Sequence, residues 1–149
     1  MIRLIIVSDS FSHFKDAILE YEKRLKDIEI FKIKPENSTD VKNIVKKETG
    51  KIKGYIEKNK GYTIYLDVLG ESLDTNRFHD LIEKTYQNNS KINIIIGGAY
   101  GIDLNAMGNI IDMKISLSKM TFPHSLALLM ILEQIYRIDS IKKNTGYHH

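Results

Sequence analysis

Short runs of β-branched residues alternate along the chain with longer stretches in which apolar residues recur every three or four positions. The short runs predict five strands, at Arg3–Val7, Ile28–Ile33, Tyr62–Val68, Ile92–Ile96 and, shortest, Lys114–Leu117. Strands separated by helices are typical of a parallel sheet with helices on both faces. We therefore expect one α/β domain over residues 1–149, built on a mostly parallel sheet.

The stretches between the strands have the apolar spacing and the capping residues of helices. The expected helices cover residues 12 or 13 to 26, residues 41 to 58, a segment capped by Asp74 or Thr75, and a short segment from Asp103 through Ile110.

The last predicted helix differs from the others because it is apolar almost all round. Every residue from Leu126 to Leu132 is apolar, and Ile135, Ile138 and Ile141 continue the pattern. Such a helix needs burial on more than one side. One side would face the sheet, and a two-fold partner subunit would cover another. The pattern favours a homodimer, with a helix buried deep in a monomer as the alternative.

Composition narrows the compartment and the chemistry. The chain has no cysteine, which excludes disulfides, thiolate catalysis and cysteine-ligated metals. The apolar run at residues 1–7 is too short for a signal peptide, and the run at residues 126–132 is far shorter than the ~20 residues of a membrane span. We expect a cytoplasmic protein that does not enter a membrane.

The formal net charge of +3 is compatible with a polyanionic partner but does not require one. A loose basic stretch is formed by Lys46, Lys47, Lys51, Lys53, Lys58 and Lys60. The simpler interpretation is a lysine-rich helix face in solvent, and a nucleic-acid contact is the alternative. Charge alone does not decide between them.

Two glycine-bearing turns follow predicted strands, where open α/β sheets bind their ligands. The first is Ile96-Gly97-Gly98-Ala99-Tyr100-Gly101, whose glycines would let a ligand approach the backbone. Its spacing fits neither the dinucleotide fingerprint nor the P-loop. The second is Leu66-Asp67-Val68-Leu69-Gly70, in which Asp67 either binds a ligand or caps neighbouring amides.

Two further segments carry polar groups that suit a ligand site. Ser116–His124 places hydroxyls, a lysine and a methionine on a loop, and Pro123 gives that loop an extended entry into the last helix. His124 is interpreted first as a helix-entry residue and second as a chemical group. Tyr147 and His148 would fold back over a site or form a free end. The five histidines have no metal-ligand spacing, so we predict no metal.

Taken in order, six segments resemble the ribosomal RNA large subunit methyltransferase H family, which belongs to the SPOUT class. They are Tyr21-Glu22-Lys23-Arg24-Leu25, the Leu66-Asp67…Gly70 turn, the Ile96-Gly97-Gly98…Gly101 loop, Leu117-Ser118-Lys119-Met120-Thr121-Phe122-Pro123-His124, Glu133-Gln134-Ile135-Tyr136-Arg137 and Tyr147-His148. The similarity covers essentially the whole chain, and the fourth and fifth segments are its most specific part.

The resemblance implies a homodimer of α/β subunits with a C-terminal trefoil knot. It implies methyl transfer from S-adenosylmethionine to N3 of a pseudouridine in 23S ribosomal RNA, either free or in the assembled ribosome. Tyr147 and His148 would lie near the acceptor at the dimer interface, as the candidate catalytic residues. The donor would bind at Leu66, Gly97, Leu117, Ser118, Lys119, Met120, Thr121 and Phe122.

The chain departs from the family pattern at four places. Ser8-Asp9 stands where Gly-Lys is usual, Ser125 replaces a proline, Leu128 replaces an arginine, and His149 replaces a basic residue. We expect these changes to remove positive charge from places that face RNA.

Three alternatives stay open at this point. Arg137 would contact a phosphate or, as its spacing from Glu133 favours, form an ion pair within the helix. The protein as a whole would be a dimer that binds RNA without chemistry, or a flavodoxin-like or nucleotide-binding α/β enzyme. Binding of S-adenosylmethionine separates the methyltransferase from the first of these rivals, and a bound flavin or nucleotide would indicate the second.

Overall fold

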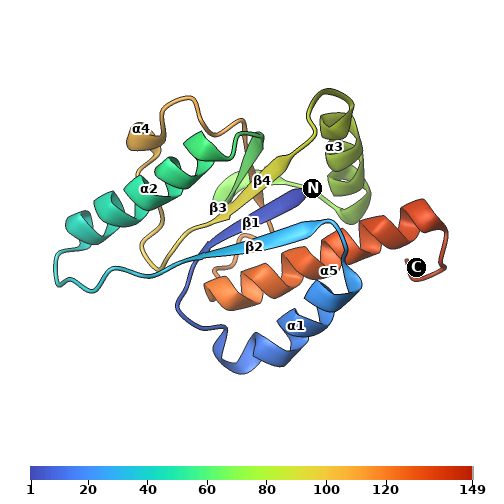
Figure 1. Ribbon diagram of the computed structural model, residues 1–149, viewed down its shortest axis with the longest axis horizontal. Helices are drawn as coiled ribbons and strands as arrows, with labels where there is room; N and C mark the ends of the chain where they lie inside the picture. Colours follow the sequence, from blue (N-terminus) through green and yellow to red (C-terminus); the bar gives the residue numbers. More distant parts are fainter. Residues whose placement is uncertain (149) are drawn as a thin grey trace.

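The computed structural model describes residues 1–148, and its five strands form one sheet in the order β2-β1-β4-β3-β5 (Figure 1). The strands are β1 (Ile2–Val7), β2 (Ile28–Ile33), β3 (Tyr62–Ser72), β4 (Ile92–Ile96) and β5 (Met113–Ser116). Every neighbouring pair is parallel, which confirms the predicted sheet. His149, where a basic residue is usual, lies outside the described residues.

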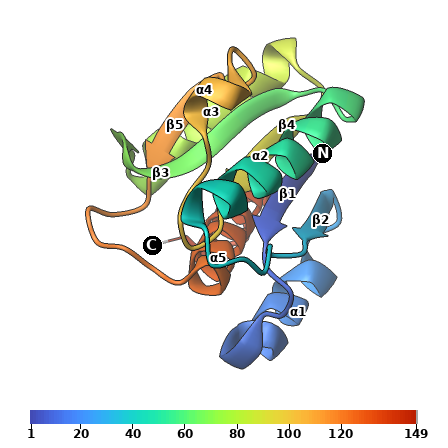
Figure 2. The ribbon, with the colours of Figure 1, turned by 90° about the vertical axis from the view of Figure 1, so that its left-hand side faces the viewer.

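Helices cover both faces of the sheet, as the alternation of elements predicted (Figures 1 and 2). They are a 3-10 turn at Ser12–Phe14 followed by α1 (Lys15–Arg24), then α2 (Val41–Lys58), α3 (Thr75–Asn88), α4 (Leu104–Met107) and α5 (His124–Lys143). Buried residues of α1, α3 and α5 pack on one face, and those of α2 and α4 pack on the other. Within residues 1–148, no helix combines the length and hydrophobicity needed to cross a membrane.

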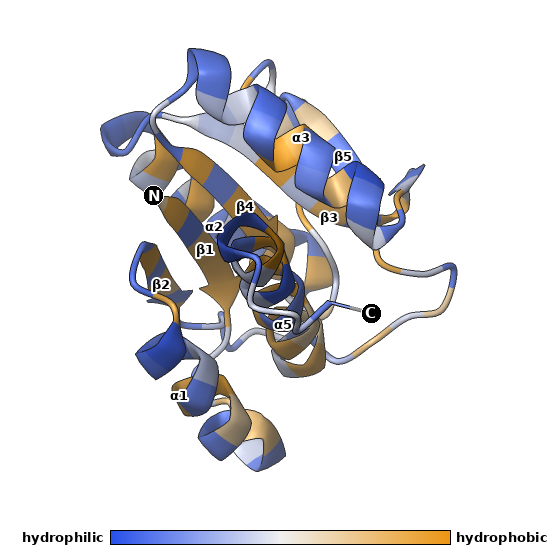
Figure 3. Ribbon diagram, turned by 90° about the vertical axis from the view of Figure 1, so that its right-hand side faces the viewer, coloured by the Kyte–Doolittle hydropathy of each residue, from blue (hydrophilic) through white to orange (hydrophobic). Residues whose placement is uncertain are grey.

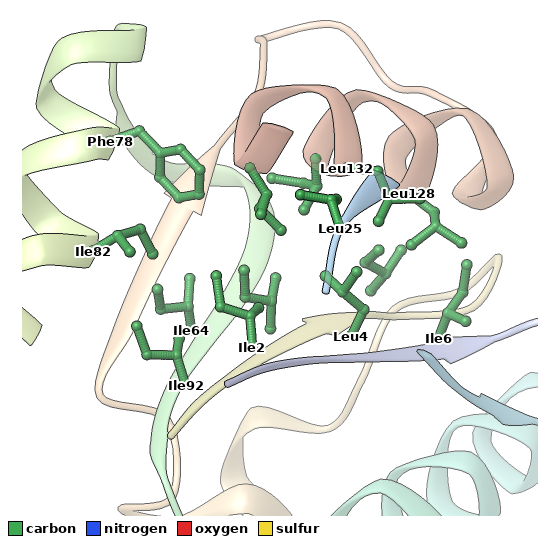
Figure 4. Close-up of a cluster of buried hydrophobic side chains, with 14 of the residues drawn as sticks. Ile2, Leu4, Ile6, Leu25, Ile64, Phe78, Ile82, Ile92, Leu128 and Leu132 are labelled. Atoms are coloured by element: carbon green, nitrogen blue, oxygen red, sulfur yellow. The ribbon is translucent and has the colours of Figure 1, made fainter. Parts of the chain in front are cut away.

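The core lies on both sides of β1, because successive side chains of a strand point to opposite faces. Leu4 and Ile6 point towards α5 and meet its Leu128 (Figure 4), whereas Ile5 and Val7 pack with the residues of α2. Each of these burials contributes about 1.5–3 kcal/mol. Hydrophobic residues predominate in β1 and β4, whereas α3 is mainly hydrophilic (Figure 3). The continuous apolar runs of the central strands follow from coverage on both faces.

Several predicted boundaries differ from the structure by one or two residues, and three larger or more telling differences have a local reason. The expected helix through Ile110 ends at Met107, because Gly108 adopts a φ of +58° that breaks the helical path. The strand predicted to end at Val68 continues to Ser72, after a register shift against β5 between Leu66 and Glu71. The first helix begins as a 3-10 turn and becomes α-helical only at Lys15.

The predicted caps lie where the sequence placed them. The Asp74 carboxylate accepts a hydrogen bond from the backbone N–H of Arg77 at 2.8 Å, and Asp103 accepts one from Ala106 at 3.1 Å. A side-chain cap of this kind contributes about 1 kcal/mol. Of the two positions considered for the third helix, Asp74 is the cap.

One expectation about the departures from the family pattern is wrong. Leu128 was expected to remove a positive charge from a place that faces RNA, but it is 0% exposed, and Ser8, next to Asp9, is only 1% exposed. Leu128 packs in the core under α5, so an apolar residue there fills the interior and takes no charge away from the surface. Asp9 is exposed, so the charge change expected at this position would lie on the surface.

Candidate functional site

A cavity of about 650 Å³ opens where the carboxyl ends of β4, β3 and β5 lie side by side. Strand ends at this edge of a parallel sheet are the usual position of a ligand site. Its wall consists of Tyr65, Leu66, Asp67, Val68, Ile96, Gly97, Gly98, Ala99, Gly101, Leu117, Ser118, Met120, Thr121, Phe122, Pro123, His124 and Ala127. Seven of the eight predicted donor-binding residues therefore share one cavity. Lys119, the eighth, is exposed and does not line it.

The glycine loop after β4 forms one wall. The N–H of Gly101 donates to the carbonyl of Gly98 at 3.1 Å, and Gly101 has a φ of +74°, which a glycine adopts without strain. On the side of α2, a Cβ on Gly98 would lie 2.7 Å from Oε1 of Glu48 and 3.2 Å from Val7. The buried Glu48 side chain thus fixes how far this loop extends towards α2.

The turn after β3 forms a second wall. Asp67 accepts a hydrogen bond from the N–H of Leu69 at 3.0 Å, so its side chain caps the local backbone while it also borders the cavity. A Cβ on Gly70 would lie 2.6–2.8 Å from the backbone of Ile115 and Lys114. This close approach to β5 accompanies the register shift, which lets residues 67–70 bulge beside the cavity.

The loop between β5 and α5 forms the third wall and is held by its own serines. The hydroxyl of Ser116 donates to the carbonyl of Ser118 at 2.8 Å, and the hydroxyl of Ser118 accepts from the N–H of Met120 at 3.0 Å. The Met120 side chain is 72% exposed at the mouth of the cavity. The predicted polar loop is therefore ordered by local hydrogen bonds.

Tyr65 and His124 line the cavity although neither was among the predicted donor-binding residues. Burial, followed by the charge of Asp67, raises the pKa of Tyr65, so its phenol stays neutral near pH 7. No sequence pattern distinguished Tyr65 from the other residues of its predicted strand. His124 was considered at helix entry, and the structure adds that it faces the cavity.

The C-terminal tail lies along its own α5, away from the cavity of its own chain. The ring of Tyr147 packs edge-on against Tyr136 at 4.9 Å, and the guanidinium of Arg137 lies 5.0 Å from the Tyr147 ring. The cavity borders α5 at Ala127, about 13 Å along the helix from Tyr136 at 1.5 Å per residue. Nδ1 of His148 is buried and has no hydrogen-bond partner among the described residues.

Arg137 forms the predicted ion pair within the helix. Its Nε donates to Oε1 of Glu133 at 2.9 Å, and this bonding raises the pKa of the guanidinium. The Tyr147 hydroxyl lies 3.4 Å from the same carboxylate oxygen. Glu133 therefore connects the end of the chain to α5.

A second cavity, also about 650 Å³, lies between α1, α3 and α5 and is strongly apolar. Leu126, Leu129 and Met130 of α5 line it and are only half-buried. Leu117 lines both cavities, so the two adjoin. The all-round apolar helix thus leaves one side incompletely covered.

Within residues 1–148, no three histidine, aspartate or glutamate side chains gather closely enough to hold a metal ion. The absence of a metal stays a prediction.

Comparison with known proteins gives the family. Residues 1–148 match the family model described as "Predicted SPOUT methyltransferase". Ribosomal RNA large subunit methyltransferase H of Fusobacterium nucleatum is 37% identical over 141 residues, covering 91% of this chain and 90% of its own. Proteins of the same name from Ruminiclostridium cellulolyticum and Caldicellulosiruptor saccharolyticus are 36% and 35% identical, covering 91% and 99% of both chains. The chain belongs to the ribosomal RNA large subunit methyltransferase H family of SPOUT methyltransferases.

Proposed function

We propose that this protein transfers a methyl group from S-adenosylmethionine to N3 of a pseudouridine in large-subunit ribosomal RNA. One observation carries the proposal: three loops far apart in the sequence line a single cavity at the carboxyl ends of adjacent strands. The names of the relatives, which are ribosomal RNA methyltransferases, supply the substrate class. Because ribosomal RNA is the proposed substrate, we expect the protein to act in the cytoplasm.

The cavity fits the donor in size and in chemistry. Its volume of about 650 Å³ lies within the range of about 300–1,000 Å³ that small-molecule sites occupy. Leu66, Gly97 and the loop of residues 117–122 would hold the adenosine and the bent methionine part, largely through backbone groups. Glycine at 97 and 98 leaves the backbone accessible to the ligand. S-adenosylmethionine supplies an electrophilic methyl group, and the cavity orients it.

We include the trefoil knot and the homodimer in the proposal. Family membership supports both, and the half-buried Leu126, Leu129 and Met130 support a partner that covers α5. Because the apolar cavity adjoins the donor cavity at Leu117, a subunit that fills the first would lie next to the second. The site would then be completed across the dimer interface.

In this arrangement Tyr147 and His148 act on the donor cavity of the partner subunit. Their position along α5, away from their own cavity, is consistent with such a crossing. Tyr147 would stack on the target base, as aromatic residues do in RNA recognition. His148 would position the nucleotide or accept the N3 proton, with solvent as the other acceptor.

Two measurements test the function. Calorimetry should show that the protein binds S-adenosylmethionine, and mass spectrometry should show one methylated pseudouridine that is absent from ribosomal RNA of cells lacking the protein. A protein that binds RNA but not the donor would instead be the non-catalytic RNA-binding dimer.

Deletion of residues 147–149 tests the role of the tail. We expect methylation to be lost while the affinity for S-adenosylmethionine changes by less than about twofold, because in the proposal the tail contacts the target nucleotide and not the donor. Unchanged methylation by the truncated protein would refute this assignment.

A further inference from the structure

Positive charge is concentrated in one part of the chain. Residues 32–60 contain nine lysines and four acidic residues, a net charge of +5. The rest of the chain has thirteen lysines and arginines against fifteen acidic residues, a net charge of −2. The mild overall charge of +3 therefore hides a strongly basic segment, made of the end of β2, α2 and the loops around them.

The lysines of α2 lie in two rows along its exposed side. At 100° per residue, one row contains Lys42, Lys46 and Lys53, and the other contains Lys47, Lys51 and Lys58. Glu48 faces the interior and is 3% exposed, so it does not offset this surface charge. Glu57 is the one exposed acidic residue of the helix.

Most of these lysines are not engaged by the fold. Lys51 pairs with Glu36 at 2.6 Å, and Nζ of Lys53 donates to the carbonyl of Ala106 at 3.1 Å. Within the described part of the chain, Lys42, Lys46, Lys47 and Lys58 form no ion pair.

Two other helices of this protein, α1 and α5, pair their charges internally. α1 has an i,i+4 pair between Glu20 and Arg24, and α5 has the pair between Glu133 and Arg137 as well as the pair between Asp139 and Lys143. Such pairs are the ordinary way to stabilise a solvent-exposed helix. In the described chain α2 has no internal pair, although its like charges repel one another. α3 also lacks an internal pair between a lysine or arginine and a carboxylate among the described residues, but α2 differs from it because the exposed charges of α2 are nearly all positive.

Aromatic rings lie beside one lysine row. Phe31 of β2 and Tyr55 of α2 stack at 3.8 Å between ring centroids with planes 12° apart. They line a shallow groove of about 470 Å³ together with Lys32, Lys34, Lys51, Gly54 and Lys58. A lysine-lined groove with aromatic rings is typical of surfaces that bind RNA.

The basic surface begins beside the donor cavity. Glu48, in the first half of α2, contacts Gly98 of the glycine loop, so this part of the helix lies directly behind one wall of the cavity. The 18 residues of α2 extend about 27 Å along the face of the sheet, with Glu48 near the middle, as Figure 2 shows for the helix over the strands. A strand of RNA whose target base enters the cavity would have neighbouring phosphates within reach of these lysines.

We propose that the two lysine rows of α2, with the groove beside β2, bind the phosphate backbone of ribosomal RNA outside the nucleotide that is modified. We call this the α2 basic surface: Lys34, Lys42, Lys46, Lys47, Lys51, Lys53 and Lys58. The occupant is RNA because the surface offers many unpaired cations and few polar acceptors. The inference rests on the proposed function for the identity of the polyanion.

The test compares two triple variants of equal charge. Lys46→Gln, Lys47→Gln and Lys58→Gln remove three unpaired lysines of the α2 basic surface. Lys26→Gln, Lys84→Gln and Lys91→Gln remove three exposed lysines elsewhere. Binding of a fluorescent large-subunit ribosomal RNA fragment is measured by anisotropy between 50 and 300 mM salt. The first variant should lose about tenfold or more in affinity, and the slope of log K against log salt should fall by about 2.

Methyl-donor binding separates this inference from the proposed function. Calorimetry should give the same affinity for S-adenosylmethionine in both triple variants and in the parent protein. Equal RNA affinity and equal salt slope in the two variants would overturn the α2 basic surface, even if the parent protein methylates RNA. A parent protein that binds neither the donor nor RNA would overturn the proposed function as well.

Discussion

Gly98 lies between the donor cavity and the buried carboxylate of Glu48. Oε2 of Glu48 accepts a hydrogen bond from the N–H of Glu36 at 2.9 Å, which fixes the side chain in place. Oε1 has no partner among the described residues and lies against Gly98. The absence of a side chain at residue 98 therefore lets the loop pack against α2 and keeps the cavity open on its other side.

Replacing Gly98 by alanine should displace this loop. The added Cβ would lie 2.7 Å from Oε1 of Glu48, closer than such contacts occur. Because Oε2 of that carboxylate is held by the N–H of Glu36, we expect the loop to move towards the cavity. We expect affinity for S-adenosylmethionine to fall about tenfold, measured by calorimetry. Gly50→Ala is the matched control, because a Cβ there meets nothing within 4 Å. Equal donor affinity in the two variants would contradict the proposed role of Gly98.

Tyr86 makes stability depend on pH in the alkaline range. Burial, followed by the charges of Asp27 and Glu83, raises its pKa to about 12 from the ordinary 10. Between these two values the folded protein keeps a proton that the unfolded chain releases, so the free energy of unfolding falls as pH rises. Below pH 10 this contribution is fully present.

Tyr86→Phe should reduce the loss of unfolding free energy that occurs as pH rises above 10. Urea unfolding at pH 9, 10.5 and 11.5 would show a smaller loss of stability in the variant than in the parent protein, with absorbance at 295 nm reporting phenol ionisation. The variant should still lose some stability as pH rises, because other tyrosines, such as Tyr65 and Tyr62, also have a raised pKa. An identical slope in the variant would mean that Tyr86 ionises equally in both states.

At the scale of elements, β3 and β5 together shape the cavity at their carboxyl ends. Their ladder pairs Leu66 with Ile115 and then, after the shift, Glu71 with Ile115. The segment between bulges out, and Gly70 closes it by approaching the backbone of β5. The longer strand that the sequence did not predict is thus the element that shapes one wall.

Gly70→Ala should destabilise the protein. Its Cβ would lie 2.6–2.8 Å from backbone atoms of Lys114 and Ile115, which cannot rotate away as a side chain can. We expect a loss of about 1–3 kcal/mol in the free energy of unfolding. Gly54→Ala, in the interior of α2 with open space around it, should instead gain about 0.5–1 kcal/mol. If both substitutions have equal and small effects on the free energy of unfolding, β5 can shift to accept the added Cβ without loss of stability.

At the scale of the whole molecule, α5 is incompletely covered within one subunit. Its buried residues face the sheet, and Leu126, Leu129 and Met130 border an apolar cavity on the outside. Large apolar patches on a surface commonly mark an interface. The cavity adjoins the donor site, so assembly and activity should be linked.

Leu129→Glu should therefore yield a monomer that does not methylate RNA. Sedimentation equilibrium would give a mass near 17.2 kDa for the variant and about twice that for the parent protein. Leu104→Glu, at a 41% exposed leucine of α4 on the opposite face, is the control and should stay dimeric. Thermal unfolding confirms that both variants are folded. If the parent protein sediments as a monomer, the proposed homodimer is wrong.

Much of the fold was predictable from the sequence because it depends on local pattern. Runs of β-branched residues placed all five strands, and Asp74 and Asp103 marked the starts of two helices. The three loops that line the cavity were predictable as turns after strands, and the ligand proposed for them comes from the resemblance of Leu117–His124 to a known family. Local pattern suffices where the periodicity and the capping residue lie in the same segment.

The tertiary structure alone decided which segments meet. The order β4-β3-β5 brings residues 66, 97 and 117 together, although nothing near any one of them specifies its neighbours in the sheet. Burial likewise placed Leu128 in the core, turned Glu48 towards Gly98 and left the lysines of α2 outside. Sheet order and burial depend on packing between distant parts of the chain, whereas periodicity and capping act within a few residues.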